Sequence, residues 1–366
     1  MRLKTLIIFL FISAFSFGQN LPKINVLIEK ELKSNKVPAI AVAVIDSGKV
    51  VHMTTSGFKD WDGQLRADNN TSFHIASVSK VVTNMAIFKL VEKGKIDLKT
   101  DINEYLPFSI KNPHYPKDKI TISELLNHRS GIRDNYEIYE PLWSTPNGDP
   151  KTELETFLRD YLSENGKLYQ KEHFESGADF KSFSYSNTGV ALLGLIVENV
   201  TNLSFEDYCQ NEIFKPLKME NTSWFLKNLN TEQVAKTYTN KDSTGLKFNG
   251  HNGYPDYPAG QLRTSISDFS KLLSGYLNSD NSEFILEKAT ISQITPTPQV
   301  SQNGYFTWFL TAMNNNLYYS HEGGDTGVRT VVLIDVNKKN AIAIFANAEY
   351  KLGNLLRGIE TTMWKK

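Results

Sequence analysis

The hydrophobic period changes twice along this chain of 366 residues, and that change limits the fold more than any other feature. Residues 39–58, AIAVAVIDSGKVVHMTTSGF, predict two strands joined at Asp46-Ser47-Gly48, a hairpin signal. Three further strands are predicted near the C-terminus, in LYYSHEG, VRTVVLIDV and AIAIFANAE. From Ser77 to about residue 300 the apolar spacing is mainly helical.

This order predicts an α+β fold, with one antiparallel sheet built from both chain ends and covered by terminal helices at about 21–36 and 352–364. The sheet lobe is expected at about 21–75 and 301–366, and a mostly helical lobe at about 76–300. Both lobes belong to one domain, residues 19–366. A cleft between lobes is the usual place for a binding site.

Residues 1–18 differ from the rest of the chain. Arg2 and Lys4 precede the apolar run 6–17, and small residues stand before Gln19, as in a secretory signal peptide. The run is too short to favour a retained membrane helix, which needs about 20 apolar residues. We therefore expect a secreted or periplasmic protein, cleaved before Gln19 and without a stable membrane anchor.

Charge and cysteine content exclude several classes of protein. Lys+Arg and Asp+Glu number 40 each, so no basic excess indicates nucleic-acid binding. The single cysteine, Cys209, allows no internal disulfide and is expected to be a buried thiol. No histidine or cysteine spacing is typical of a metal site, so neither a metal nor a cofactor is predicted.

Ser-x-x-Lys occurs twice. Ser56-Gly-Phe-Lys59 ends a predicted strand, where residues i and i+3 point to opposite faces. Ser77-Val-Ser-Lys80 opens a long predicted helix, where i and i+3 share a face and the Lys80 amine can reach the Ser77 hydroxyl. The helix N-terminus also offers N–H groups to an oxyanion. Taken alone, the motif favours a helix-capping serine with a solvated surface lysine.

A serine hydroxyl needs a partner that takes its proton. The chain has no Gly-x-Ser-x-Gly motif, but Tyr185-Ser-Asn187 stands directly before an apolar helix. A tyrosine beside a cation can share such proton transfer. Two other Tyr-x-Asn triplets, at Tyr238 and Tyr276, lie in a polar loop and at a helix end. The first triplet alone would also fit a turn with an asparagine cap.

A third element is His321-Glu-Gly323-Gly324, at the end of a predicted strand. Two glycines at a strand edge let a substrate approach the backbone closely. The other His-x-Gly copy, at His251, lies in a loop rich in glycine and asparagine. A histidine at a strand end also commonly pairs with a nearby acid.

Ser-x-x-Lys, Tyr-x-Asn and His-x-Gly, in this order, resemble the active-site elements of the penicillin-recognising serine hydrolases: class C β-lactamases, D,D-peptidases and related esterases. The stretches FHIASVSK, ISELLNHRSGI, PAGQLRTSISDFSKLL and HEGGDTG are also similar to that family. The resemblance implies that Ser77 is the acyl-forming nucleophile and that Lys80 and Tyr185 share general-base work. It further implies that Asn187 bonds the substrate amide or Lys80.

The resemblance places His321 where typical β-lactamases have a lysine. It also implies that Gly323 and Gly324 contact the substrate, with the N–H groups of Ser77 and Gly324 forming an oxyanion hole. A histidine is a weaker, pH-dependent cation than lysine. Glu322 would oppose a substrate carboxylate if it points into the cleft.

These features predict an exported serine hydrolase that acts on amides or esters without a cofactor. Its expected partners are small molecules or peptides: D-amino-acid peptides of the peptidoglycan type, β-lactams or short acyl esters. Uncharged esters are expected to be turned over more efficiently than β-lactams. The alternative is a peptidoglycan- or penicillin-binding protein that is acylated but does not turn over.

Overall fold

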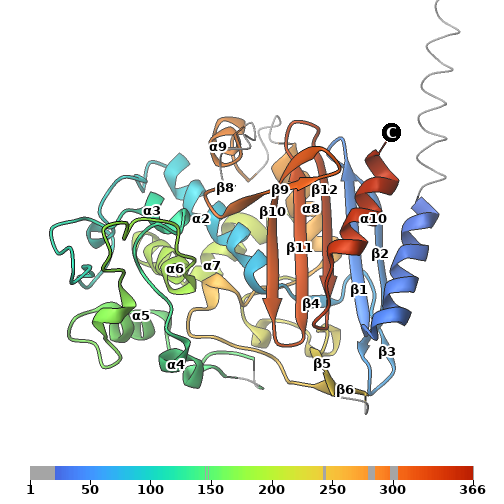
Figure 1. The fold of residues 1–366 in the computed structure, drawn as a ribbon, viewed down its shortest axis with the longest axis horizontal. Helices are drawn as coiled ribbons and strands as arrows, with labels where there is room; N and C mark the ends of the chain where they lie inside the picture. The colour runs from blue at the N-terminus through green and yellow to red at the C-terminus, as the bar shows by residue number, and fades with distance from the viewer. Residues whose placement is uncertain are drawn as a thin grey trace, which may run out of the picture.

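The computed structural model describes residues 21–144, 146, 148–241, 245–278, 285–296 and 304–365. The predicted signal peptide, residues 1–18, lies outside the described residues. The fold is the predicted sheet, with the central helices packed on one face and the terminal helices on the other (Figure 1).

Both chain ends contribute to one antiparallel sheet, as predicted. Its strand order is β3-β2-β1-β12-β11-β10-β9-β8, so β1 from the N-terminal region pairs with β12 from the C-terminal region. The strands are β1 (Ala39–Asp46), β2 (Lys49–Asp60), β3 (Leu65–Arg66), β8 (Gly304–Tyr305), β9 (Trp308–Met313), β10 (Asn316–Asp325), β11 (Val328–Asp335) and β12 (Asn340–Ala346). The sequence did not predict β8 or β9.

The predicted turn between the first two strands is present. Ser47 and Gly48 both have positive φ, 51° and 78°, as a two-residue type I′ hairpin requires. The Ser47 N–H donates to the Asn340 side-chain oxygen at 3.0 Å, and the Gly48 N–H donates to the Lys339 carbonyl at 2.7 Å. The first hairpin is thereby fixed to the turn that precedes β12.

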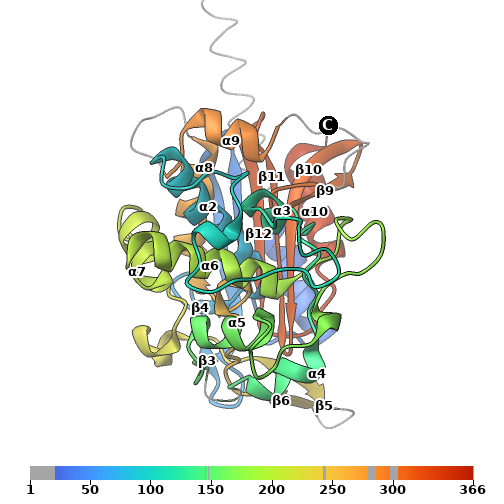
Figure 2. The ribbon, with the colours of Figure 1, turned by 90° about the vertical axis from the view of Figure 1, so that its left-hand side faces the viewer.

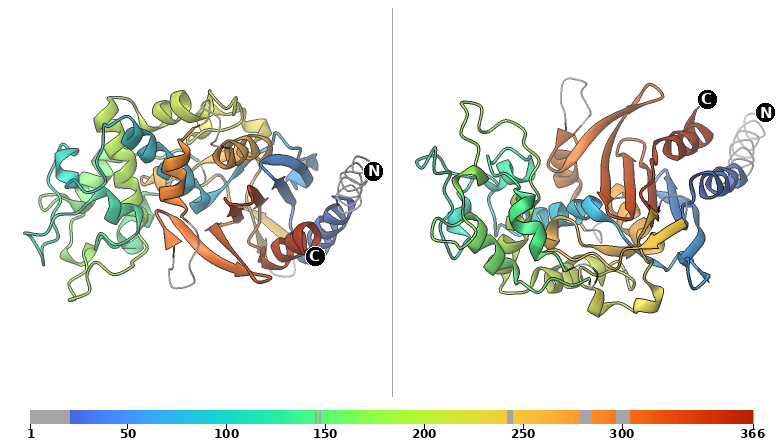
Figure 3. Two further views of the ribbon diagram at one scale, coloured as in Figure 1. Left: turned by 90° about the horizontal axis from the view of Figure 1, so that it is seen from above. Right: turned by 60° about the horizontal axis from the view of Figure 1, so that its bottom comes forward.

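Both faces of the sheet are covered, which explains the continuous apolar sequence of β1. Ile40, Val42 and Val44 belong to the core beneath the terminal helices, residues 21–35 and α10 (Gly353–Trp364). Ala41 and Ala43 belong to the core on the opposite face. Figure 3 shows the two terminal helices together on the outer side of the sheet.

The central part of the chain is mainly helical, as predicted, and Figure 2 shows its helices stacked in front of the sheet. Its α-helices are α2 (Ser79–Glu92), α3 (Ile122–Leu126), α4 (Tyr136–Tyr139), α5 (Leu154–Leu162), α6 (Asn187–Thr201), α7 (Phe205–Cys209), α8 (Ile266–Leu277) and α9 (Lys288–Ile294). Helix α8 packs directly on β1, β2 and β12.

Short elements link these helices. Two pairs of short strands were not predicted: β4 (Ser72–His74) with β7 (Arg263–Ser265), and β5 (Tyr238–Lys241) with β6 (Gly245–Phe248). The single-turn helices used below are η1 (Ala76–Val78) and η9 (Tyr257–Ala259).

Cys209 is fully buried, as predicted, and burial raises the pKa of its thiol. Over the described ranges, no single helix is long and apolar enough to cross a membrane, although the bent pair Asn187–Thr201 and Phe205–Phe214 passes that test by length and composition.

Candidate active site

Ser77 and Lys80 are in contact at the beginning of α2. Ser77 lies in η1, the turn directly before the helix, and Lys80 lies in the first turn of α2. The Lys80 Nζ donates to the Ser77 Oγ at 3.1 Å. Ser77 is half-buried, whereas the Lys80 side chain is fully buried. The predicted i, i+3 contact is therefore present, and Lys80 is not a solvated surface lysine.

Two further oxygens surround the Lys80 ammonium group. It donates to the side-chain oxygen of Asn187 and to the carbonyl of Ala259, both at 2.6 Å. Together with Ser77 these acceptors match the three donors of an ammonium group. Lys80 thus joins the start of α2, the start of α6 and the turn η9.

Tyr185 lies beside this lysine, in the loop before α6. The Lys80 Nζ is 4.8 Å from the centre of the Tyr185 ring, a cation–π distance. The ring stacks on His128, with centroids 4.4 Å apart, and its other neighbour is Phe309 of β9. Tyr185 remains 36% exposed, so the ring is held by packing while part of it stays accessible.

Asp134 positions Asn187, and sequence reasoning missed it. Its carboxylate accepts hydrogen bonds from the backbone N–H groups of Asn187 and Thr188 and from the Ser186 hydroxyl, at 2.6, 3.0 and 3.0 Å. These donors form the N-terminus of α6, where a carboxylate is favoured. The sequence signal was weak, because Asp134 lies 53 residues before Asn187.

His321 lies on β10 beside the same group. It is 2% exposed, and its Nδ1 is 2.9 Å from the Glu322 carbonyl. Burial and the nearby Lys80 ammonium lower the pKa of His321 to about 3. The imidazole is therefore neutral near pH 7, and the expectation of a pH-dependent cation at this position is wrong.

Glu322 does not share the face of His321. His321 is paired with Val332, which belongs to the core facing the central helices, whereas Glu322 is paired with Val331, which belongs to the core beneath α10. Side chains alternate along a strand, so the Glu322 carboxylate points away from the site. Glu322 is therefore not placed to oppose a substrate carboxylate in the cleft.

Gly323 brings β10 against the turn that carries Ser77. A Cβ atom here would lie 2.1 Å from the Thr330 Oγ1 and 2.4 Å from the Ile75 carbonyl oxygen, closer than real contacts allow. The Thr330 hydroxyl donates to that same carbonyl at 2.7 Å. Past Ser320, the last residue of β10 paired with β9, the outer edge of β10 has no neighbouring strand among the described residues.

The rival motif copies lie elsewhere. Lys59 donates to the Gln233 side chain at 2.8 Å and not to Ser56. Tyr238 and Tyr276 are buried in β5 and α8, where their hydroxyls bond other groups. His251 lines a separate cavity with Lys59.

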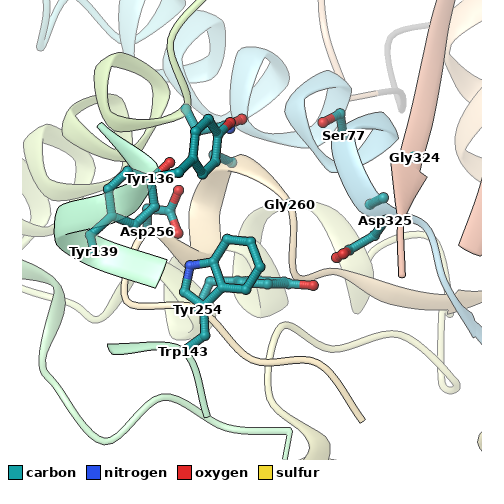
Figure 4. A pocket seen from close by; sticks show the side chains of 12 residues that line it. Ser77, Tyr136, Tyr139, Trp143, Tyr254, Asp256, Gly260, Gly324 and Asp325 are labelled. Carbon is teal, nitrogen blue, oxygen red and sulfur yellow. The ribbon is translucent and has the colours of Figure 1, made fainter. Parts of the chain in front are cut away.

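Ser77 and Gly324 line an open cavity of about 140 Å³ together with Asn187 (Figure 4). Tyr136, Tyr139, Trp143 and Tyr254 provide aromatic walls, and Asp256 and Asp325 provide two carboxyl groups. The Tyr136 hydroxyl accepts from the Asn187 side chain at 2.8 Å. Sequence reasoning named none of these aromatic or acidic residues.

Both carboxyl groups are shifted toward the neutral form. Burial, and then the Asp134 carboxylate, raise the pKa of Asp256 to about 7, against the opposing effect of Lys80. Burial raises the pKa of Asp325 to about 6. Over the described residues, no cluster of three or more His, Cys, Asp or Glu side chains could hold a metal ion.

An antiparallel sheet covered by helices on both faces, with Ser-x-x-Lys at a helix start beside Tyr-x-Asn, defines the class of penicillin-recognising serine hydrolases. The model of the Beta-lactamase family matches residues 24–359, and the chain belongs to this family of serine hydrolases.

Comparisons with individual proteins agree with this assignment. The chain is 26% identical over 326 residues to Protein flp of Staphylococcus aureus (strain MRSA252), a match that covers 89% of this chain and 62% of that protein. It therefore spans about six tenths of the length of the flp proteins that it matches.

Two solved structures have the same fold. One is an octameric penicillin-binding protein homologue from Pyrococcus abyssi, with a TM-score of 0.73 and 22% identity, covering 93% of this chain and 76% of that one. The other is a D-amino acid amidase from Ochrobactrum anthropi in complex with D-phenylalanine, with a TM-score of 0.73 and 17% identity, covering 95% and 98%.

Proposed function

We propose that this protein hydrolyses amide or ester bonds through an acyl-enzyme on Ser77. The observation that carries the proposal is the position of the Ser77 hydroxyl at the wall of an open cavity, 3.1 Å from a fully buried lysine amine. A buried amine next to an accessible hydroxyl is unusual on a protein surface, and nucleophilic serines need such a neighbour.

In the acylation step the Ser77 oxygen bonds to the substrate carbonyl carbon, and its proton passes to the Lys80–Tyr185 pair. Lys80 already donates to three oxygens, which favours a role in stabilising a Tyr185 phenolate as the proton acceptor. The carbonyl electron pair moves onto oxygen, which accepts from the N–H groups of Ser77 and Gly324.

Collapse of this intermediate breaks the bond to the leaving alcohol or amine, which takes the proton from the pair. Water then attacks the acyl-enzyme by the same proton route and releases the acid and Ser77. Asn187 holds Lys80 through its oxygen, and His321, neutral near pH 7, lies buried near Lys80.

A steady-state assay tests this proposal. The purified protein is given a p-nitrophenyl ester, a chromogenic cephalosporin and a D-Ala-D-Ala peptide, and turnover of at least one is expected. Ser77→Ala should abolish it, while Ser56→Ala should not. A single burst without further turnover would instead identify a penicillin- or peptidoglycan-binding protein.

We also propose that the protein acts outside the cytoplasm, on peptides or small molecules of the cell envelope. The support is the pattern of residues 1–18 alone. Mass spectrometry of the protein from an expressing bacterium should find a mature chain that begins at Gln19. A chain retained in the cytoplasm with residues 1–18 intact would contradict this localisation.

A further inference from the structure

We propose that the cavity beside Ser77 selects acyl groups that carry a protonated amine, and that Asp256 binds the ammonium group. This inference rests on the proposed function, because it names the substrate class of the same site. It follows from the cavity walls, which combine the buried carboxyl group of Asp256 and the half-buried one of Asp325 with aromatic rings (Figure 4).

Asp256 is held in place by the turn that also binds Lys80. Its carbonyl accepts from the Ala259 N–H at 2.9 Å, and the Ala259 carbonyl accepts from the Lys80 Nζ at 2.6 Å. The residue is 6% exposed, yet it lines the cavity. The backbone of Asp256 is therefore fixed within the same turn whose Ala259 carbonyl orients Lys80.

Among the described residues, the Asp256 carboxyl group accepts from its own backbone N–H, and no other residue's side chain donates to it. Buried polar groups are normally paired, and a buried carboxylate with only this one donor leaves most of its acceptor capacity unused, which is costly. Lys80 is the nearby cation, but its three donors are engaged by Ser77, Asn187 and Ala259. A ligand that supplies N–H donors and positive charge would satisfy this carboxyl group.

The electrostatic environment favours such a ligand. Burial, and then the negative charge of the nearby Asp134 carboxylate, raise the pKa of the Asp256 carboxyl group to about 7. A bound ammonium group would favour the ionised form of Asp256. Asp325, also partly shielded from solvent, adds a second carboxyl group on the side of Gly324.

The aromatic walls suit a cation as well. Trp143 packs edge-on against Tyr254, with ring centroids 5.0 Å apart, and Tyr139 lies 6.5 Å from Trp143. Faces of tryptophan and tyrosine attract ammonium groups within about 6 Å. Among the described residues that line this cavity, none is Lys, Arg or His.

A substrate carboxylate, as carried by β-lactams and D-Ala-D-Ala ends, would thus meet two acids at these walls rather than a cation. This changes the expectation from the sequence, where neutral esters were placed first. An ester whose acyl group carries an α-ammonium should be hydrolysed with a higher kcat/KM than an ester with a neutral acyl group of the same shape.

Alanine benzyl ester and isobutyric benzyl ester test the inference, because a methyl group replaces the ammonium group at nearly equal size. Both alanine enantiomers are assayed by release of benzyl alcohol, at pH 7.5, and corrected for spontaneous hydrolysis. The wild type should favour the better alanine ester in kcat/KM by about tenfold or more, as expected for hydrogen bonds to a charged group.

Asp256→Asn keeps the shape of the side chain and removes its charge. It should lower kcat/KM for the alanine ester by about 10–100-fold and leave the isobutyric ester within about threefold. Asp62→Asn, on the exposed turn after β2, is the control and should change neither. Equal losses on both esters in Asp256→Asn, or no preference in the wild type, would overturn the inference.

A binding measurement separates this inference from the proposed function. In the Ser77→Ala variant, calorimetry should find tighter binding of alaninamide than of isobutyramide, and Asp256→Asn in that background should remove the difference. If this holds while the wild type hydrolyses no ester, the proposed hydrolysis fails and the ammonium site stands. If the two amides bind equally while esters are hydrolysed, the ammonium site is wrong and the hydrolase stands.

Discussion

The Lys80 ammonium group faces the ring of Tyr185 at 4.8 Å while its three donors are used by other oxygens. A cation fixed in this way lowers the free energy of a nearby phenolate, and a phenolate in turn favours the charged lysine. The two residues should therefore act as one unit in the proton transfer from Ser77 rather than as two independent groups.

Lys80→Ala and Tyr185→Phe should each lower the acylation rate by about 10²-fold or more, as for the loss of a positioned base. The double variant should be little worse than either single variant, because groups that act as a unit are not additive. The measurement is the single-turnover rate with a chromogenic ester. Multiplicative losses would show that the residues act separately.

Ser77 should be the site of acylation. A fluorophosphonate probe followed by peptide mapping should label Ser77, and Ser77→Ala should abolish the label. Ser56 is a matched control within the same motif, because Lys59 bonds Gln233 instead of Ser56. Labelling that survives Ser77→Ala, or that depends on Ser56, would refute the assignment.

Asp134→Ala should impair both stability and catalysis, because it removes the acceptor of three donors at the start of α6. We expect a loss of about 1–2 kcal/mol in the free energy of unfolding, as for a lost helix cap, and a fall in kcat of about tenfold. Urea titration and steady-state kinetics measure the two effects.

Ser204→Ala is the control for the Asp134 variant, since Ser204 caps α7 through the Asp207 N–H at 3.0 Å, outside the cavity lining. It should lower stability and leave kcat unchanged. If Asp134→Ala also leaves kcat unchanged, its role is structural alone and the positioning of Asn187 does not depend on it.

Glu322→Thr should leave the ratio of kcat/KM values for an ester and a cephalosporin unchanged within about twofold. The Glu322 side chain points away from the site, and solvent screens the charge of this exposed carboxylate. A clear shift toward the cephalosporin would mean that Glu322 reaches the cleft after all.

Asp256→Asn should stabilise the protein more at pH 8 than at pH 4. The folded protein holds a proton on Asp256 up to pH of about 7, whereas the unfolded chain releases it near 3.8. Wild-type stability therefore falls as pH rises between these values, by at most about 4 kcal/mol from this group. The asparagine variant lacks this loss.

The check is the difference in free energy of unfolding between variant and wild type, measured by urea titration at several pH values. It should move in favour of the variant between pH 4 and 7 and then level off. A difference that is constant across this range would mean that Asp256 keeps an ordinary pKa in the folded protein.

The hydrophobic period predicted those helices and strands in which apolar residues repeat regularly over several helical turns or strand pairs. The apolar β1 and the hairpin at Ser47-Gly48 follow from local sequence, and so does the i, i+3 contact of Ser77 with Lys80. Strands as short as β4 and β7 have too few residues to show a period, and they exist because tertiary contacts hold them.

Only those site residues that lie in short local motifs were predicted from the sequence. Asp134 and Asp256 reach the centre through loops from distant parts of the chain, and single aspartates carry no signal of that kind. The neutrality of His321 also depends on burial and on Lys80, which the sequence does not reveal. Local chemistry was therefore predictable, whereas the electrostatics of the cavity required the fold.

The pairing of β1 with β12 has a consequence for biosynthesis. The Ala39 N–H donates to the Asn347 side chain across 308 residues, so the middle of the sheet joins segments from almost opposite ends of the chain. At about 5–20 residues per second, a ribosome would need roughly 15–60 s to deliver the partner of β1. During that time the apolar β1–β2 hairpin has an unpaired edge, which is prone to aggregation. Loss of the last strands during translation would leave this edge permanently open, so chaperone binding to the nascent hairpin should decide the yield of native protein.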